Sequence, residues 1–587
     1  MGKASMKSRK RLVYFFVIVA IALVVMCFRV GWIQIVNGGE YKQKAMAQQT
    51  KTTTVVSKRG TIYDRNGHVL AMSADTYAIW ARPTTIPKKE LDKTAGTLSK
   101  ILSLDKDDLK KQLSQERSLI KIDKGLEYKI AQKIKEEKLI GIEITSDVTR
   151  YYPASTLASQ LLGNVSEDNE GLAGLELQYN DVLKGSEGKE VSTTDRNGNI
   201  LSYGQNDYNA AKDGCSIVST IDSVVQNRVE RIINKGKKST SAKKVTCMIM
   251  DPETGNILAS ASTENYNPNN PRVPLDDAEA NNLKNMNSQE QFEYLNKMWR
   301  NPLVSDTYPP GSTFKLLTLC AALEEGKSSL GDHFFDSGTY QVSGQTLKCW
   351  SFRNPHGDET LKQAVSNSCN PVFIQLGQRL GVSKFYKYLN GFGITGTTGV
   401  DYPGEASAII RKEKGINPID FATMTYGQGI AVTPIQVLTI ASTIGNEGVL
   451  MQPKLVQEIK TEKGKTVKTI EDKKVRQVVS KDTAHEAKEA MRYTVEEGGG
   501  KAAKVAGYKT GGKTGTAQNE MTIGKGQDTY YASFVGLAPI DDPKVALIVI
   551  VDDPKGRTHG SEAAAPIAKE INEFLLPYIG AKPTESK

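Results

Sequence analysis

The stretch GYKTGGKTGTAQ, residues 507–518, is compatible with two unrelated kinds of fold. Residues 507–514 satisfy the phosphate-binding pattern G-x-x-x-x-G-K-[ST], which requires a strand before the loop and a helix after it. The stretch also contains the triplet Lys-Thr-Gly twice, beginning at Lys509 and at Lys513. The surrounding sequence therefore has to distinguish a nucleotide-binding fold from a different kind of catalytic domain.

The segments that flank this stretch argue against nucleotide binding. The preceding EEGGGKAAKVAGY has no apolar run of strand length, and the following Gly-Thr-Ala-Gln favours extended chain. Beyond it, residues 529–539 and 544–553 predict two apolar strands, the second β-branched enough to be central in a sheet. Residues 245–262 predict strand, turn and strand, and residues 565–579 a closing helix. We expect a mixed α/β domain whose sheet joins strands from both of its ends.

A serine and a lysine three positions apart mark a candidate nucleophile. In YPPGSTFK (308–315), Ser312 precedes Lys315 at the start of an apolar helical run, which places both side chains on one helix face. The hydroxyl would be the nucleophile and a neutral lysine its base. For Lys315 to act near neutral pH, its pKa has to fall from about 10.4 to roughly 7, which burial and a second cation can supply. The spacing alone is weak, because it also occurs at four serines among charged residues, Ser103, Ser118, Ser186 and Ser241.

A second polar motif follows in SNSCNP, residues 366–371. The hydroxyl of Ser368 and the amide of Asn370, two positions apart, can relay a proton and clamp an amide substrate. Taken alone, such a motif is more often a polar loop with a helix cap. The order S-x-x-K, S-x-N, K-T-G is much more specific than any one of the three motifs.

In this order of motifs the chain resembles the class B penicillin-binding proteins, the peptidoglycan D,D-transpeptidases, and the resemblance covers nearly the whole chain. The family pattern K-T-G-T-A is matched by residues 513–517, so Lys513 is the family lysine and Lys509, followed by Thr-Gly-Gly, is a bystander. Five further segments are similar to family segments: RGTIYDRNGHVLA (59–71), TIDSVVQ (220–226), DPETGNILA (251–259), WRNPLVSDTYPPGSTFK (299–315) and YGQGIAVTPIQ (426–436). The fourth of these and YAIWARP (77–83) look more like division- or sporulation-type members than elongation-type ones.

The resemblance implies a serine acyl-enzyme mechanism for catalytic residues Ser312, Lys315, Ser368, Asn370 and Lys513. Ser312 would attack the penultimate D-alanine of a stem peptide and release the terminal D-alanine, while Lys315 takes its proton. Ser368 would pass a proton to the leaving amine, and Asn370 would hold the peptide amide and Lys315. An amine from a second stem peptide would then resolve the acyl-enzyme and form the cross-link. β-Lactams, which mimic the D-Ala-D-Ala end, would acylate Ser312.

The resemblance also assigns the residues around Lys513. Lys513 would lower the pKa of its neighbours, and the hydroxyls of Thr514 and Thr516 would bind the terminal carboxylate, with Gly515 completing this substrate-binding strand. The backbone N–H groups of Ser312 and Thr516 would form the oxyanion hole.

The N-terminus predicts a single membrane anchor. Five basic residues and no acid precede LVYFFVIVAIALVVMCF, residues 12–28, whose length of roughly 26 Å nearly spans a hydrocarbon core. A cleaved signal peptide is the alternative, but its apolar region would be shorter. The basic residues on the N-terminal side of this apolar segment predict a cytoplasmic N-terminus and an extracellular or periplasmic catalytic domain. The resemblance to a class B enzyme implies a separate polymerising partner, which we expect to be a SEDS-family glycosyltransferase among the divisome or elongasome membrane proteins.

We expect a cytoplasmic tail (1–11), a transmembrane anchor (12–36), an elongated β-rich pedestal or dimerisation domain (37–212), a penicilloyl-serine transferase domain with a central antiparallel sheet flanked by helices (213–580), and a tail (581–587). The repeated Asp-Arg-Asn-Gly, at 64–67 and 195–198, predicts two hairpin turns.

Composition limits the other classes of function. The net charge of +10 suits an anionic membrane or wall polymer, whereas no arginine-rich block with interleaved aromatics points to nucleic acid. The six cysteines show no C-x-x-C and no zinc-type spacing, so we expect buried free thiols, with one bridged pair left open, no metal and no cofactor.

Three alternatives stay open at this point. The same motifs serve D,D-carboxypeptidases and β-lactamases, in which water resolves the acyl-enzyme, although such hydrolases do not need the roughly 170-residue segment between anchor and catalytic domain. A lactam-sensing receptor would need further membrane spans. A protein that acts chiefly as a scaffold of a division or elongation complex is the alternative from a different class.

Overall fold

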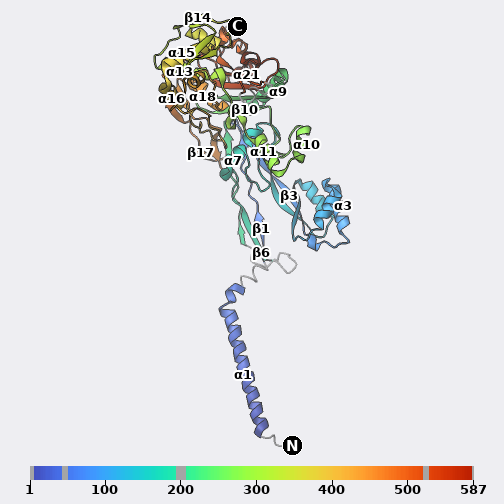
Figure 1. Cartoon of the computed structure of the whole chain (residues 1–587). Coiled ribbons are helices and arrows are strands. Elements are labelled where there is room, and N and C mark those ends of the chain that lie inside the picture. The colour runs from blue at the N-terminus through green and yellow to red at the C-terminus, as the bar shows by residue number, and fades with distance from the viewer. Residues whose placement is uncertain (1–5, 42–49, 194–206, 520–527, 585–587) are drawn as a thin grey trace. The chain divides into compact units, whose positions relative to one another are not determined.

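The computed structural model describes residues 6–41, 50–193, 207–519 and 528–584, which form two compact units (Figure 1). The first unit contains residues 1–57 and 186–212, and the second contains residues 58–185 and 213–587. The second predicted hairpin turn, at 195–198, lies outside the described residues.

The first unit contains one long apolar helix and a small sheet. Helix α1 (Met6–Ile35) is, among the described residues, the one helix long and apolar enough to cross a membrane. It contains most of the predicted anchor and is consistent with a single-pass membrane protein. Strands β1 (Thr50–Val55), β6 (Gly188–Thr193) and β7 (Asp207–Asn209) form an antiparallel sheet in the order β1-β6-β7.

The hairpin predicted in RGTIYDRNGHVLA is present in the second unit. Strands β2 (Ile62–Tyr63) and β3 (Val69–Ala81) pair antiparallel across a turn in which Gly67 has a φ of 89°. The buried carboxylate of Asp64 holds this turn, because it accepts hydrogen bonds from the backbone N–H groups of Asn66 and His68, each at 2.8 Å. Its other oxygen accepts from the Ser223 hydroxyl at 2.6 Å, which ties the turn to the start of helix α9 (Ser223–Thr240).

This hairpin belongs to a sheet that draws strands from both predicted domains. The strand order is β17-β16-β8-β2-β3-β4, with β5 also paired to β3. The other strands are β4 (Ile120–Leu126), β5 (Ile142–Tyr151), β8 (Ser216–Ser219), β16 (Val456–Lys460) and β17 (Thr466–Thr469). Helices α3 (Leu91–Leu102), α4 (Lys106–Leu113) and α5 (Tyr128–Glu136) bury their apolar faces with β3 in a separate small core. The boundary at residue 212 stays a prediction.

The catalytic-domain fold is built on a five-stranded antiparallel sheet in the order β10-β9-β21-β20-β19. Its strands are β9 (Lys244–Met250), β10 (Ile257–Ser262), β19 (Gly511–Gln518), β20 (Tyr530–Ala538) and β21 (Val545–Asp552). The β-branched strand β21 is central, as its composition predicts, and the sheet joins strands from both ends of the domain. Most of the GYKTGGKTGTAQ stretch forms strand β19 instead of a loop followed by a helix, which excludes the phosphate-loop interpretation.

Helices cover both faces of this sheet. Because side chains alternate along a strand, Leu547 and Val549 pack with α9 and α21 (Ala565–Tyr578), whereas Ile548 and Ile550 belong to the larger core on the other face. That larger core contains the buried helices α13 (Lys315–Glu324) and α18 (Pro434–Gly445). The mixed α/β fold with a helix-flanked antiparallel sheet is confirmed.

The remaining helices and strands surround this framework. They are α6 (Ser159–Leu162), α7 (Gly174–Gln178), α8 (Asn180–Leu183), α10 (Asp277–Asn285), α11 (Ser288–Trp299), α12 (Pro302–Ser305), α14 (Leu361–Asn367), α15 (Asn370–Leu380), α16 (Val382–Gly391), α17 (Pro418–Met424), α19 (Lys481–Glu496), α20 (Gly560–Ala563), β11 (His333–Asp336), β12 (Thr339–Val342), β13 (Gln345–Lys348), β14 (Gly357–Thr360), β15 (Val449–Met451) and β18 (Lys474–Gln477).

Candidate active site

The candidate nucleophile lies on a short turn of 3₁₀-helix that runs directly into α13. This turn, η2 (Gly311–Phe314), begins at Gly311, whose φ of 54° lies in the left-handed region that favours glycine. The backbone N–H of Gly311 donates to the carbonyl of Gly427 at 3.0 Å. Ser312 is half-buried, whereas Lys315, the first residue of α13, is completely buried.

The amine of Lys315 is directed at the second motif. Its Nζ donates to the backbone carbonyl of Ser368 at 2.7 Å, to the hydroxyl of Ser368 at 3.2 Å, and to Oδ1 of Asn370 at 2.7 Å. Burial lowers the pKa of Lys315 to about 8, although nearby acidic groups oppose the shift. A lysine with this pKa is neutral in a sizeable fraction of molecules near neutral pH, which a general base requires.

The second motif lies between two helices. Ser368 ends α14 in the left-handed region, with a φ of 58°, and Asn370 begins α15. This sharp change of direction turns the Ser368 hydroxyl toward both lysines. Its Oγ is 3.2 Å from the amine of Lys315 and 3.0 Å from that of Lys513.

Lys513 lies on β19, the edge strand of the five-stranded sheet, and is completely buried. Its Nζ also donates to the backbone carbonyl of Thr514 at 2.9 Å. The pKa of Lys513 lies well below its ordinary value. Burial is the larger cause, and the charge of Lys315 is the smaller one. The charge of Lys315 therefore adds to the effect of burial at Lys513, whereas burial alone lowers the pKa of Lys315.

The residues that follow Lys513 line the strand beside the nucleophile. Thr514 and Thr516 are half-buried and lie on the same side of β19. Gly515 is buried, and a Cβ there would lie 2.5 Å from Ser533 Oγ and 3.0 Å from Thr313 Cγ2. A glycine is therefore needed for β19 to approach the helix that carries Ser312. The hydroxyl of Thr516 accepts from the backbone N–H of Gly560 at 3.1 Å.

Lys509 does not belong to this group. It precedes β19, its side chain is partly exposed, and its amine is 3.8 Å from a carboxylate oxygen of Asp541. Of the two Lys-Thr-Gly copies, the second is the one whose lysine contacts Ser368.

Three residues near Lys315 were not singled out from the sequence. The ring centroids of Phe373 and Tyr426 lie 5.2 Å and 6.0 Å from its amine, and Gly427 accepts the bond from Gly311. Tyr426 and Gly427 begin the YGQG segment already noted for its similarity to the family, which is the signal that would have found them. Phe373 carries no such signal.

Comparison with known families assigns the chain to a class of enzyme. Residues 245–573 match the model of the penicillin binding protein transpeptidase domain, and residues 54–219 match that of the penicillin-binding protein dimerisation domain. The chain belongs to the class B penicillin-binding proteins, which are serine-type D,D-transpeptidases.

Individual relatives agree over nearly the whole length. Stage V sporulation protein D of Bacillus subtilis is 34% identical over 99% of this chain and 87% of its own length. A probable peptidoglycan D,D-transpeptidase, PenA, of Neisseria meningitidis is 28% identical over 99% of this chain and 95% of its own. The crystal structure of penicillin-binding protein 2X of Streptococcus thermophilus superposes with a TM-score of 0.71, at 26% identity, over 92% of this chain and 83% of that one.

Proposed function

We propose that Ser312 is the acylated nucleophile with which this transpeptidase cross-links stem peptides. The observation that carries the proposal is the convergence of two buried lysine amines on the Ser368 hydroxyl, with Lys315 one helical turn from Ser312. Such convergence supplies both a base with a lowered pKa and a path for the proton.

In the acylation step, the Ser312 hydroxyl attacks the carbonyl carbon of the penultimate D-alanine and gives its proton to neutral Lys315. The ester bond to Ser312 forms, and the peptide bond to the terminal D-alanine breaks. Ser368 lies between the two lysines and passes a proton to the leaving amine, so that D-alanine departs neutral overall. Asn370 fixes the amine of Lys315 and the peptide amide of the donor.

The edge strand would bind the rest of the donor. The hydroxyls of Thr514 and Thr516 take the terminal carboxylate, because they lie on the same side of β19. The amine of Lys513 acts through its contact with Ser368. Alternate backbone N–H groups of an edge strand are not used by the sheet, so the N–H of Thr516 is suited to form the oxyanion hole with that of Ser312. The amine of a second stem peptide then attacks the ester, which releases Ser312 and forms the cross-link.

Labelling with a fluorescent penicillin tests the nucleophile. We expect one covalent label per wild-type chain and none on Ser312→Ala, as detected on a denaturing gel and located by peptide mass spectrometry. Ser118→Ala is the matched control, because Ser118 has the same lysine spacing but is exposed. Label that persists in Ser312→Ala would refute the assignment.

A donor peptide ending in D-Ala-D-Ala, with a D-amino acid as acceptor, separates transfer from hydrolysis. We expect acceptor-containing product with full-length chain in detergent micelles. Exclusive release of the hydrolysed donor would instead favour a carboxypeptidase.

We further propose that the N-terminus before α1 is cytoplasmic and that the catalytic domain faces the wall outside. The basic residues before α1 and the wall location of the substrate support this orientation. A polymerising membrane protein of the SEDS family is the partner we propose for the anchor and the dimerisation domain. Co-purification that is lost when α1 is replaced by an unrelated span would support the partner; unchanged co-purification would exclude contact through the anchor.

A further inference from the structure

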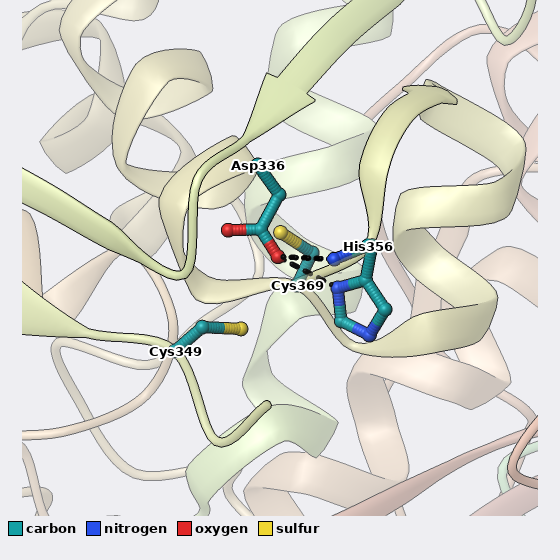
Figure 2. Close-up of side chains that lie close together, drawn as sticks. All are labelled: Asp336, Cys349, His356 and Cys369. Atoms are coloured by element: carbon teal, nitrogen blue, oxygen red, sulfur yellow. Dashed lines mark hydrogen bonds and ion pairs between the residues drawn. The ribbon is translucent and has the colours of Figure 1, made fainter. Parts of the chain in front are cut away.

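Four side chains that bind metals in other proteins meet beside the Ser368–Asn370 motif. They are Asp336, Cys349, His356 and Cys369, and one ligand atom from each lies within 4.8 Å of all the others. Figure 2 shows them pointing toward one another, with Nδ1 of His356 directed at the carboxylate of Asp336. We propose that these residues form a tetrahedral Zn²⁺ site that fixes the loop carrying Ser368 and Asn370.

The donor set and spacing suit zinc. Two thiolates, one imidazole and one carboxylate are ligands that Zn²⁺ accepts at about 2.0–2.3 Å, so the ligand atoms of a tetrahedral site are roughly 3.3–3.8 Å apart. His356 Nδ1 and Asp336 Oδ2 are already 2.8 Å apart, and both thiols are free. Shifts of about 1 Å complete the site. On binding, the thiols and Nδ1 give up their protons, and the imidazole carries its remaining proton on Nε2.

Burial explains why a cation is stabilising at this place. The side chains of Asp336, Cys349 and Cys369 are almost completely buried, and that of His356 is 14% exposed. Glu359, only 2% exposed, lies beside them, with Oε1 3.8 Å from His356 Nδ1. Among the described residues that oxygen has no hydrogen-bond partner, whereas Oε2 accepts from the Asn367 side chain at 2.9 Å. A buried carboxylate oxygen without a partner is costly, and a divalent cation close by offsets that cost.

The four residues lie at the ends of different elements, so a metal would join these elements together. Asp336 ends β11, Cys349 follows β13, His356 precedes β14, and Cys369 precedes α15. Strands β11 and β14 form one two-stranded sheet, and β12 and β13 form another, each with only four residues per strand. Sheets this small are marginal by themselves, and a bound metal contributes its binding energy to folding.

The same segment touches the candidate active site. Cys369 lies between Ser368 and Asn370 in the chain. The side-chain N–H of Asn370 donates to the Lys348 carbonyl at 3.5 Å, and the indole of Trp350 donates to the Asn367 carbonyl at 2.9 Å. A metal bound to Cys349 and Cys369 would therefore hold Ser368 against the two lysines. This effect on acylation rests on the roles proposed above, whereas metal binding itself does not.

Metal content tests the site directly. Full-length chain is purified in detergent with reductant and without chelator, and then analysed by plasma mass spectrometry. We expect about one zinc per wild-type chain and at least tenfold less in Cys349→Ala. Cys247→Ala is the matched control, because it removes an equally buried thiol from β9, and it should retain its zinc.

Wild-type chain provides a second test that does not depend on a variant folding. Removal of zinc with a strong chelator should lower the melting temperature and slow penicillin acylation at least tenfold, and added Zn²⁺ should restore both. Co²⁺ added to the stripped protein should give a thiolate charge-transfer band that Cys349→Ala lacks.

Three outcomes would overturn the site: wild-type protein without zinc even after incubation with Zn²⁺, equal loss of zinc in Cys247→Ala, or a disulfide between Cys349 and Cys369 in freshly isolated protein. If zinc is bound but acylation does not change on its removal, only the link to Ser368 and Asn370 is wrong. Labelling of Ser312 tests the nucleophile separately.

Discussion

At the scale of single residues, the site depends on two lysines whose amines are both withdrawn from water. Lys315 and Lys513 are completely buried and both reach the hydroxyl of Ser368. Burial penalises the charged form of an amine, so each lysine is closer to neutrality than a surface lysine is. The sequence already required a lowered pKa at Lys315, and the structure provides the cause.

The pKa of Lys315 predicts the pH dependence of acylation. Because the neutral amine accepts the proton of Ser312 and burial lowers this pKa to about 8, acylation is suppressed below that pH and approaches a plateau above it. We expect the second-order rate constant for penicillin to rise up to about tenfold per pH unit below the pKa. Stopped-flow labelling between about pH 6 and pH 9 measures it. A flat profile would contradict the role of Lys315.

Substitution distinguishes the two copies of Lys-Thr-Gly. Lys513→Ala removes the second amine that contacts Ser368, and with it one end of the proposed proton path, so we expect acylation to fall about 100-fold. Lys509→Ala removes only an exposed contact with Asp541 and should stay within about twofold of wild type. Both rate constants come from the same penicillin assay, and the reverse order would exclude Lys513 from the site.

At the scale of elements, the site is a contact between a short helical turn and an edge strand. Turn η2 packs against β19, and glycines at 311 and 515 allow the two backbones to approach. A Cβ at Gly311 would lie 2.9 Å from the carbonyl oxygen of Thr516 and 3.2 Å from Cβ of Ala517. The distance between Ser312 and the strand therefore depends on the absence of side chains at positions 311 and 515.

Gly311→Ala tests this contact. The new methyl group forces β19 away from Ser312, so we expect acylation to slow at least tenfold, in addition to a cost of about 1–2 kcal/mol for a left-handed alanine. Gly326→Ala is the control, because Gly326 also has a left-handed φ, of 58°, but a Cβ there lies within 4 Å of no atom in the part of the chain that the structure describes. The control should lose similar stability and keep its acylation rate. Equal acylation by both variants would contradict the steric argument.

At the scale of the molecule, a buried cluster of charges joins segments that are far apart in the sequence. Glu176 accepts from Arg59 and, at 2.6 Å, from Nε of Arg150, and all three side chains are almost fully buried. Arg150 also donates to the carbonyl of Gly60 at 2.8 Å, and Arg59 to the side chain of Asn180 at 2.8 Å. The Arg-Gly that begins RGTIYDRNGHVLA therefore serves the packing of the second unit.

Glu176→Gln should destabilise the fold without touching the site. The substitution leaves two buried guanidinium groups without their carboxylate, which costs roughly 3–5 kcal/mol. Glu143→Gln, in a partly exposed pair with Arg82, should cost no more than about 1 kcal/mol. Denaturant unfolding followed by tryptophan fluorescence compares them. A Glu176→Gln chain as stable as the control would show that the cluster is not held by charge.

The sequence by itself determined the features that short-range chemistry encodes. The continuous, β-branched apolar run of residues 544–553 predicted the central position of β21, and Asp64-Arg65-Asn66-Gly67 predicted a hairpin turn, because these signals depend on neighbouring residues. The ordered motifs predicted Ser312, Lys315, Ser368, Asn370 and Lys513 as catalytic residues, which stays a prediction.

Only the tertiary structure decided which distant groups share an environment. The burial of Lys513 beside Lys315 and the meeting of Asp336, Cys349, His356 and Cys369 have no counterpart in local spacing, since these groups come from different strands and helices. The sequence predicted no metal because it lacks a C-x-x-C spacing. That spacing can indicate only ligands that are close together in the chain. The physical reason is that burial and electrostatic coupling depend on distance in space, and the packing of the whole chain sets that distance.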